Sequence, residues 1–324
     1  MTRRATPLAI ASITAAALAL AGCTSSDPDT AAAPSGSAGA GATVVATTTI
    51  WGDITRQVVE CAGAGEVTTL IPVGSDPHDF SPSSQDVAAL VGADLVIANG
   101  LGLEERLEES LASAQQDGAN VLEIAPLLDP LPFGVEGEEH AEDEAEEHSG
   151  EDPHVWHDVS RAAKTAGLIG AELTRSTGNP EFAECGTRLQ GELMTVHDEV
   201  AATLATVPEE RRVLVTDHDA LGYLAAAYGY TVAGTVVPGG STLAEPSSAE
   251  LAALAATVRE TGVPAIFANT ANPQALVEAL ASEVGDIAVV DLYVDSVGAP
   301  GSGADTYQGM VTTNAQRISA ALAG

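Results

Sequence analysis

The sequence predicts an α/β protein with two Rossmann-like lobes, each built on a parallel sheet, joined by one long rigid helix. Short β-branched runs alternate with alanine-rich amphipathic stretches along most of the chain, which is the pattern of βα units. The turn signal Gly178-Asn179-Pro180 interrupts this alternation. A long helical pattern follows the turn, and we expect a single helix there to act as a stiff spacer between the lobes.

The expected elements follow from hydrophobic periodicity. Strands are expected at 43–48, 66–71, 95–98 and 120–124 in the first lobe and at 212–216, 231–237, 265–268 and 288–292 in the second. Helices are expected at 50–60, 83–91, 104–113, 220–228, 247–260, 272–282 and 306–323. A linking helix over 181–206 is indicated by apolar residues three and four positions apart, namely Leu189, Leu193, Val196, Val200 and Leu204. The lobes would then span 43–178 and 207–324, with a connecting segment over 179–206.

The N-terminus has the features of a secretory signal. Basic Arg3 and Arg4 precede an apolar run that ends at Leu20, shorter than the ~20 residues that span a bilayer. The sequence Leu20-Ala21-Gly22-Cys23 resembles the bacterial lipobox, in which the cysteine is acylated and the preceding segment is removed. We therefore expect a signal peptide over 1–22, a lipid on Cys23 and a flexible tether over 23–42. An uncleaved membrane anchor is the alternative.

Composition limits the partners. A formal net charge of −34 excludes nucleic acid on electrostatic grounds. After the tether about 280 residues remain, enough for two domains of ordinary size. If Cys23 carries lipid, Cys61 and Cys185 are left as a pair in an oxidising compartment, either bonded to each other or as two buried thiols.

One segment departs from the alternation of expected strands and helices. Residues 136–151 crowd Glu and Asp around His140 and His148 with almost nothing apolar, which predicts a disordered acidic loop.

Histidines at strand-to-helix junctions are the central functional signal. Of seven histidines, His78 and His154 each follow an Asp-Pro pair, and His218 follows the strand that ends at Thr216. Open α/β sheets bind ligands at these junctions. Neutral imidazoles are common ligands of zinc and other first-row ions, so the three histidines predict a shared metal site. The last strand of the second lobe offers Asp291 and Asp295 as a fourth ligand, and Asp295 is preferred because it lies beyond the strand.

The motifs resemble those of a known family. They are Asp76-Pro77-His78 with Pro82-Ser83, Asn99-Gly100 with Glu104, Asp152-Pro153-His154-Val155-Trp156, the run His218 to Leu224 with Tyr228-Gly229, and Asp295-Ser296 with Tyr307, Met310 and Asn314. In this order they resemble the metal-binding receptors of ABC importers for zinc and manganese, the cluster A-I solute-binding lipoproteins. The resemblance covers 43–324.

The resemblance implies a site and a role. The site would be His78, His154, His218 and Asp295, two from each lobe, in the interlobe cleft. The role would be that of a monomeric lipoprotein on the extracytoplasmic face of the cell membrane, which hands its ion to the membrane permease of an ABC importer. His157 stands where the family usually has an apolar residue, and we interpret it as an exposed helix residue, with competition against His154 as the alternative. His197 is interpreted as a solvated side chain.

The ligand set favours zinc as the transported ion. Three imidazoles and one carboxylate complete a tetrahedral zinc shell, whereas manganese prefers more oxygen ligands. Manganese remains the alternative cargo. The loop with His140 and His148 resembles the histidine-bearing loop of the zinc-type members, where it gathers ions, and a solvated insertion without a site explains it equally well.

Two other classes of protein are alternatives, a zinc hydrolase and a surface adhesin. A zinc hydrolase needs an open ligand position and a general base, but four protein ligands leave no such position. The sequence also has no His-Glu-x-x-His helix or Gly-x-Ser-x-Gly elbow, so no enzyme is expected. A surface adhesin with the same fold is the remaining alternative.

Overall fold

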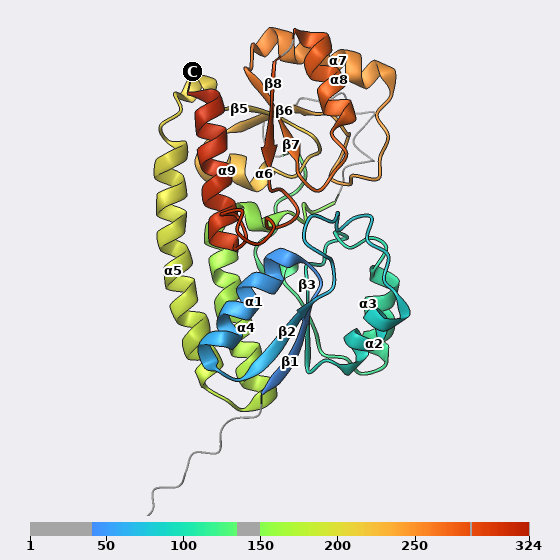
Figure 1. Cartoon of the computed structure of the whole chain (residues 1–324), viewed down its shortest axis with the longest axis vertical. Coiled ribbons are helices and arrows are strands. Elements are labelled where there is room, and N and C mark those ends of the chain that lie inside the picture. Colours follow the sequence, from blue (N-terminus) through green and yellow to red (C-terminus); the bar gives the residue numbers. More distant parts are fainter. Residues whose placement is uncertain (1–40, 135–149, 286, 324) are drawn as a thin grey trace, which may run out of the picture. The chain divides into compact units, whose positions relative to one another are not determined.

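The computed structural model describes residues 41–134, 150–285 and 287–323, which form two four-stranded sheets. The strands within each sheet run parallel, in the order β2-β1-β3-β4 in the first and β6-β5-β7-β8 in the second (Figure 1). The same order is used twice, so each half has a switch point between its two inner strands, where open α/β sheets form a ligand crevice. The predicted class of two Rossmann-like lobes is confirmed.

The elements lie close to the ranges expected from periodicity. The first half contains β1 (Ala42–Ala46), α1 (Thr49–Ala62), β2 (Gly65–Thr69), α2 (Ser84–Gly92), β3 (Leu95–Ala98), α3 (Glu108–Gln116), β4 (Val121–Glu123), a 3₁₀ turn at Ala125–Leu127, a second 3₁₀ turn at Val155–His157 and α4 (Val159–Thr177). The long helix α5 (Glu181–Leu204) and a 3₁₀ turn at Glu209–Arg211 follow. The second half contains β5 (Val213–Thr216), α6 (Gly222–Tyr228), β6 (Thr231–Thr235), α7 (Ser248–Thr261), β7 (Ala265–Asn269), α8 (Ala275–Val284), β8 (Ala288–Leu292) and α9 (Tyr307–Leu322).

Local sequence signals explain several helix boundaries. Ser83 and Ser247 each form a capping box, with Asp86 and Glu250 three residues later, so α2 and α7 begin where these serines satisfy the first free N–H groups. Helix α4 ends at Gly178, which has a positive φ of 75°. Glycine adopts this left-handed conformation without the steric cost that a side chain would bring.

The helix expected from Glu104 begins four residues later, at Glu108. Glu104 is 3% exposed, and its carboxylate bonds the turn after β3, while its carbonyl already accepts the N–H of Glu108 at 3.0 Å. Its Oε1 accepts hydrogen bonds from the amide of Asn99 at 2.7 Å and from Thr47 Oγ1 at 2.6 Å. Asn99 in turn accepts from Trp51 Nε1 at 2.8 Å, so a buried polar network fixes this turn.

Helix α5 packs along α4 and also contacts α1 and α9, one helix from each half (Figure 1). The α4–α5 contact is close because glycines face each other in it. A Cβ at Gly170 would lie 2.4 Å from the carbonyl oxygen of Phe182, and one at Gly186 would lie 2.4 Å from that of Ala166. These distances leave no space for a side chain, so α4 and α5 can approach this closely only where the glycines lie opposite each other.

The hydrophobic core continues through both halves. Its main cluster includes buried residues of β1 and β3, of α1, α4, α5 and α9, and of β5 and β7. Trp51 and Trp156 lie at its centre in an edge-to-face contact, with ring centroids 6.2 Å apart. The two sheets therefore share one packed interior.

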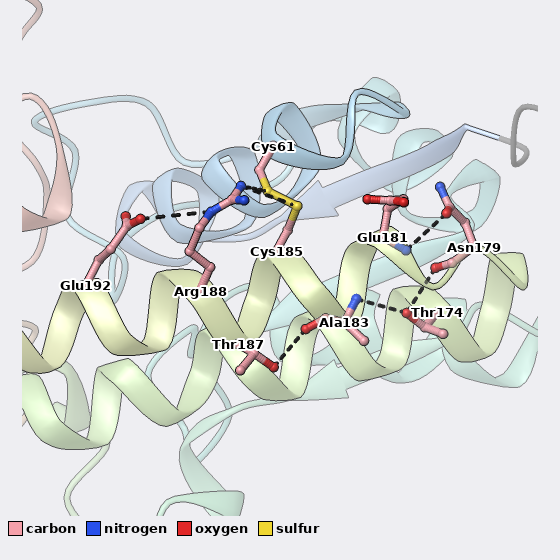
Figure 2. Close-up of a disulfide and its surroundings, with 9 residues drawn as sticks. All are labelled: Cys61, Thr174, Asn179, Glu181, Ala183, Cys185, Thr187, Arg188 and Glu192. Atoms are coloured by element: carbon pink, nitrogen blue, oxygen red, sulfur yellow. Dashed lines mark hydrogen bonds and ion pairs between the residues drawn. A yellow bond between two sulfur atoms is a disulfide. The ribbon is translucent and has the colours of Figure 1, made fainter.

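A disulfide joins Cys61, at the end of α1, to Cys185 in α5, with their Cα atoms 5.9 Å apart (Figure 2). Cys61 is exposed and Cys185 is buried. The guanidinium of Arg188, one turn after Cys185, contacts both sulfur atoms, and its Nε lies 4.0 Å from Glu192 Oε1. This bond ties the first lobe to the long helix.

Several expected features lie outside the described residues. They are the signal peptide over 1–22, the lipid site Cys23, nearly all of the tether over 23–42, and the acidic loop with His140 and His148. Across the described residues, no helix combines the length and apolar character needed to span a bilayer.

Replacing Cys61 and Cys185 together by serine should lower the free energy of unfolding by about 2–5 kcal/mol, because the disulfide closes a long loop and restricts the unfolded chain. Urea unfolding of the oxidised wild type and the double variant measures this difference. The control is the wild type with reductant, which should match the variant. Equal unfolding midpoints for oxidised and reduced wild type would contradict this expectation.

Candidate metal centre

Four side chains that are far apart in the chain converge in the structure. His78, His154, His218 and Asp295 each offer one ligand atom, and these atoms lie within 4.8 Å of one another. All four residues are at most 2% exposed. Three of them follow the carboxyl ends of β2, β5 and β8, and the fourth precedes the 3₁₀ turn before α4. The cluster is thus built at the sheet edges where ligand sites form.

The two Asp-Pro-His motifs adopt the same local structure. Asp76 Oδ1 accepts a hydrogen bond from the backbone N–H of His78 at 2.9 Å. Asp152 Oδ1 accepts from the N–H of His154 at the same distance, 2.9 Å. These are Asx turns, in which an aspartate side chain replaces a backbone carbonyl and the intervening proline restricts φ. The motif therefore presents its histidine on a pre-formed turn.

The segment that carries His154 is held by residues from the second half. The carbonyl of Asp152 accepts from Tyr223 Oη at 2.7 Å, and the carbonyl of Trp156 accepts from Tyr307 Oη at 2.7 Å. Trp156 Nε1 donates to the carbonyl of Val294 at 2.9 Å, one residue before Asp295. The position of one ligand is thereby coupled to that of another in the other lobe.

A carboxylate lies at Nδ1 of each imidazole in the cluster. The pairs are Asp152 Oδ1 with His154 at 2.7 Å, Asp217 Oδ2 with His218 at 3.2 Å and Glu105 Oε1 with His78 at 3.5 Å. A carboxylate at one ring nitrogen orients the ring and favours the tautomer with a free electron pair on the other nitrogen. Only the Asp152–His154 contact is a hydrogen bond, and it leaves Nε2 of His154 free to face an ion.

The atoms that could bind an ion lack hydrogen-bond partners in the described part of the chain. Among the described residues, no hydrogen bond reaches Nε2 of His78, His154 or His218, nor Oδ1 of Asp295. Leaving buried polar atoms unsatisfied costs about 1–3 kcal/mol each. A cation with three nitrogen ligands and one oxygen ligand would satisfy them together. A tetrahedral zinc shell needs donor separations of about 3.4 Å, within reach of small side-chain rotations.

Charges within the cluster are strongly coupled. Burial lowers the pKa of His218, but the carboxylates of Asp217 and Asp295 outweigh it and raise that pKa to about 10. Burial, followed by the charges of His218 and His78, holds the pKa of His154 well below its usual value. Burial raises the pKa of Asp295, against the lowering effect of His218 and His78.

An open pocket of about 400 Å³ lies against residues 75–76 and 79–81, on either side of His78 in the chain. Asp76 and Asp79 line it from the first half, and Asn272 and Pro273 line it from the second half. Asp79 forms an ion pair with Arg106 at 2.7 Å, and Asp76 accepts a hydrogen bond from Thr242.

Comparison with known proteins decides the family. A family model described as ZnuA, the periplasmic zinc-uptake complex component A, matches residues 44–321. The chain belongs to the ZnuA family. ZnuA-family proteins are substrate-binding components of ABC-type metal importers and are not enzymes.

Individual ZnuA-family relatives differ in their metal. Manganese-binding lipoprotein MntA of Halalkalibacterium halodurans is 30% identical over 309 residues, which is 92% of each chain. Zinc-binding protein TroA of Treponema pallidum is 34% identical over 289 residues, 86% of this chain and 88% of TroA. A solved structure of periplasmic zinc-binding TroA has a TM-score of 0.77 and 31% identity, and it covers 88% of this chain and all of its own. Membership therefore establishes metal binding without deciding between zinc and manganese.

The structure separates the four clustered residues from other candidates. Asp291 is exposed and accepts a hydrogen bond from Gln274, away from the cluster. The interpretation of His157 as exposed is wrong, because its ring is 3% exposed and lies against Trp156, with ring centroids 5.5 Å apart. It is not part of the four-residue cluster. His197 is half-buried rather than solvated, since its Nδ1 lies 3.1 Å from Tyr228 Oη.

The sequence analysis did not predict the residues that contact the outer side of the cluster, at Nδ1 of the imidazoles and at Oδ2 of Asp295. Asp152 and Asp217 precede ligand histidines by two and one positions, so an acidic residue just before each histidine was a usable signal. Glu105 follows the Glu104 of the family motif but had no signal of its own. Asn269 donates a hydrogen bond to Asp295 at 2.6 Å, and nothing in the sequence pattern indicated it.

Metal affinity should rise with pH between about pH 6 and pH 8, by about tenfold per unit. The sign follows from the His218 pKa of about 10: below that value an ion must displace a proton from His218, and the proton competes more strongly as pH falls. Calorimetric zinc titrations in buffers of different ionisation enthalpy should show release of about one proton. His197→Ala, outside the cluster, should keep the same slope. An affinity that does not change over this range would contradict the expectation.

Proposed function

We propose that this protein captures Zn²⁺ outside the cell membrane and delivers it to the permease of an ABC importer. The ion would be held by His78, His154, His218 and Asp295. The observation that carries the proposal is the set of four buried donors without partners, three imidazole nitrogens and one carboxylate oxygen.

Zinc is favoured by the chemistry of these donors. A closed shell of four nitrogen and oxygen ligands is the usual arrangement of Zn²⁺ in proteins. Manganese prefers six-coordinate shells richer in oxygen, and this cluster offers one carboxylate beside three imidazoles. All four residues of the cluster are buried, at most 2% exposed.

A manganese receptor is the second candidate. It is supported by the 30% identity to a relative named as a manganese-binding lipoprotein. First-row affinities rise toward zinc in most sites, so tighter zinc binding in the test tube does not by itself decide which ion is carried in the cell.

Attachment to the membrane is part of the proposal. The basic start, short apolar run and small residues before Cys23 support cleavage and acylation there, as in a lipoprotein. The tether that follows would let the folded part reach the permease while it stays at the extracytoplasmic surface.

Capture should involve limited movement of the lobes. Helix α5 packs against helices of both halves, and the close glycine contact with α4 fixes its position. A rigid connection of this kind supports small adjustments around the cluster, such as loop and side-chain shifts, in place of wide domain closure.

His78→Ala and His218→Ala should each weaken Zn²⁺ binding by about 100-fold or more, because either change removes a donor from a four-ligand shell. Competition against a chromophoric zinc chelator measures the affinity, and circular dichroism verifies the fold. His197→Ala is the matched control, since it removes a helix histidine outside the cluster. Unchanged affinity in the two cluster variants would refute the ligand assignment.

Deleting the gene should impair growth when zinc is chelated, and added zinc should restore it. Growth at defined free zinc and manganese concentrations measures the requirement. Restoration by manganese alone would reject the zinc assignment in favour of the manganese receptor. A strain expressing the His78→Ala variant should behave like the deletion, which links the growth requirement to the site.

A further inference from the structure

Asn269 occupies a distinctive place behind the four-residue cluster. It is the last residue of β7, and β7 lies between β5 and β8 in the second sheet. His218 follows β5 and Asp295 follows β8, so Asn269 sits between the two strands that lead to the second-lobe donors. Its side chain is inside the protein, with the residue 1% exposed.

The orientation of the Asn269 amide is set by its neighbours. The backbone N–H of Ala271 lies 3.1 Å from Asn269 Oδ1. A backbone N–H can only donate, so the atom facing it must be the amide oxygen. The amide nitrogen then faces Asp295 and donates to its Oδ2 at 2.6 Å. A turn in which the N–H of Asn272 donates to the carbonyl of Asn269 at 3.2 Å supports this conformation.

The two oxygens of Asp295 consequently differ. Oδ2 accepts the Asn269 hydrogen bond and lies 3.6 Å from His218 Nε2. Oδ1 is buried and has no hydrogen-bond partner among the described residues. The hydrogen bond from Asn269 restrains rotation of the carboxylate and occupies one lone pair of Oδ2, whereas Oδ1 keeps both of its lone pairs.

The number of oxygens that Asp295 supplies affects metal preference. With one oxygen, the cluster provides four donors, the number that suits a closed zinc site. With both oxygens it provides five donors and a larger share of oxygen, a change toward the coordination that manganese prefers.

We propose that Asn269 is a specificity-determining positioning residue, which limits Asp295 to coordination through one oxygen and thereby favours zinc over manganese. This inference rests on the four-ligand site of the proposed function. A purely structural role for Asn269 would alter stability or affect both metals equally, so the ratio of the two affinities distinguishes the roles.

The test compares Asn269→Ala and Asn269→Ser with the wild type. Alanine removes the donor to Asp295. Serine is shorter but keeps a hydroxyl that can accept from the Ala271 N–H, which preserves the turn if alanine disturbs it. Gln274→Ala is the matched control, because it removes another amide–carboxylate hydrogen bond, to Asp291 at 2.8 Å, away from the cluster.

Zn²⁺ and Mn²⁺ dissociation constants are measured by chelator competition, and Co²⁺ serves as a spectroscopic probe of coordination number. The wild type and Gln274→Ala should give the intense visible absorption of four-coordinate Co²⁺. Both Asn269 variants should give weaker absorption and a zinc-to-manganese affinity ratio reduced by about tenfold or more.

Two failures can be told apart. A wild type that prefers zinc, with the same affinity ratio and Co²⁺ spectrum in both Asn269 variants, would overturn the role of Asn269 and leave the proposed function standing. Equal loss of affinity for both metals would also overturn it, since that result indicates a structural role. A wild type that fails to bind zinc through the four residues would overturn the proposed function, and this inference with it.

Discussion

The burial of three imidazole nitrogens and one carboxylate oxygen without hydrogen-bond partners is the constraint on which the rest of the cluster depends. Imidazole nitrogens and a carboxylate oxygen that face one another away from water are unfavourable unless a cation lies between them. The surroundings are arranged so that the donors keep this geometry. A carboxylate oxygen lies near Nδ1 of each of the three imidazoles, and Asn269 donates a hydrogen bond to Asp295. Asx turns fix the two Asp-Pro-His segments.

The halves of the protein are joined at the site as well as by the long helix. Tyr223 and Tyr307 from the second half bond the carbonyls around His154, and Trp156 reaches back to the residue before Asp295. The shared hydrophobic core around Trp51 and Trp156 lies next to these bonds. Donors from opposite lobes are therefore positioned by one continuous packing arrangement, and an ion entering the cluster adds a further link between them.

Most strands and helices, and three of the four residues of the cluster, could be predicted from the sequence because local residue patterns indicate them. Strand periodicity located β3 and β8 at their observed bounds, and the turn before Pro180 marked the start of α5. His78, His154 and His218 stood out because they occupy strand ends and repeated motifs. The remaining errors concern directions of side chains. Glu104 lies inside an amphipathic helical pattern, yet its carboxylate points to the turn after β3 and is bonded there.

The burial of His157 and the contact of Asn269 with Asp295 could not be predicted from sequence patterns, because both depend on tertiary packing. A lone histidine near a helix start is usually exposed, and only the packing against Trp156 turns this ring inward. An asparagine at the end of a strand is usually a turn residue, and Asn269 does form a turn with Ala271. Its second role depends on Asp295, which is twenty-six positions away and reaches it only through the order of strands in the sheet.

The bond between Cys61 and Cys185 divides the ligands unequally. The covalent ring that it closes contains His78 and His154, whereas His218 and Asp295 lie on the open chain beyond it. The two ends of the segment that carries His78 and His154 therefore cannot separate while the disulfide is intact. The disulfide thus restrains the chain around the first pair and not around the second.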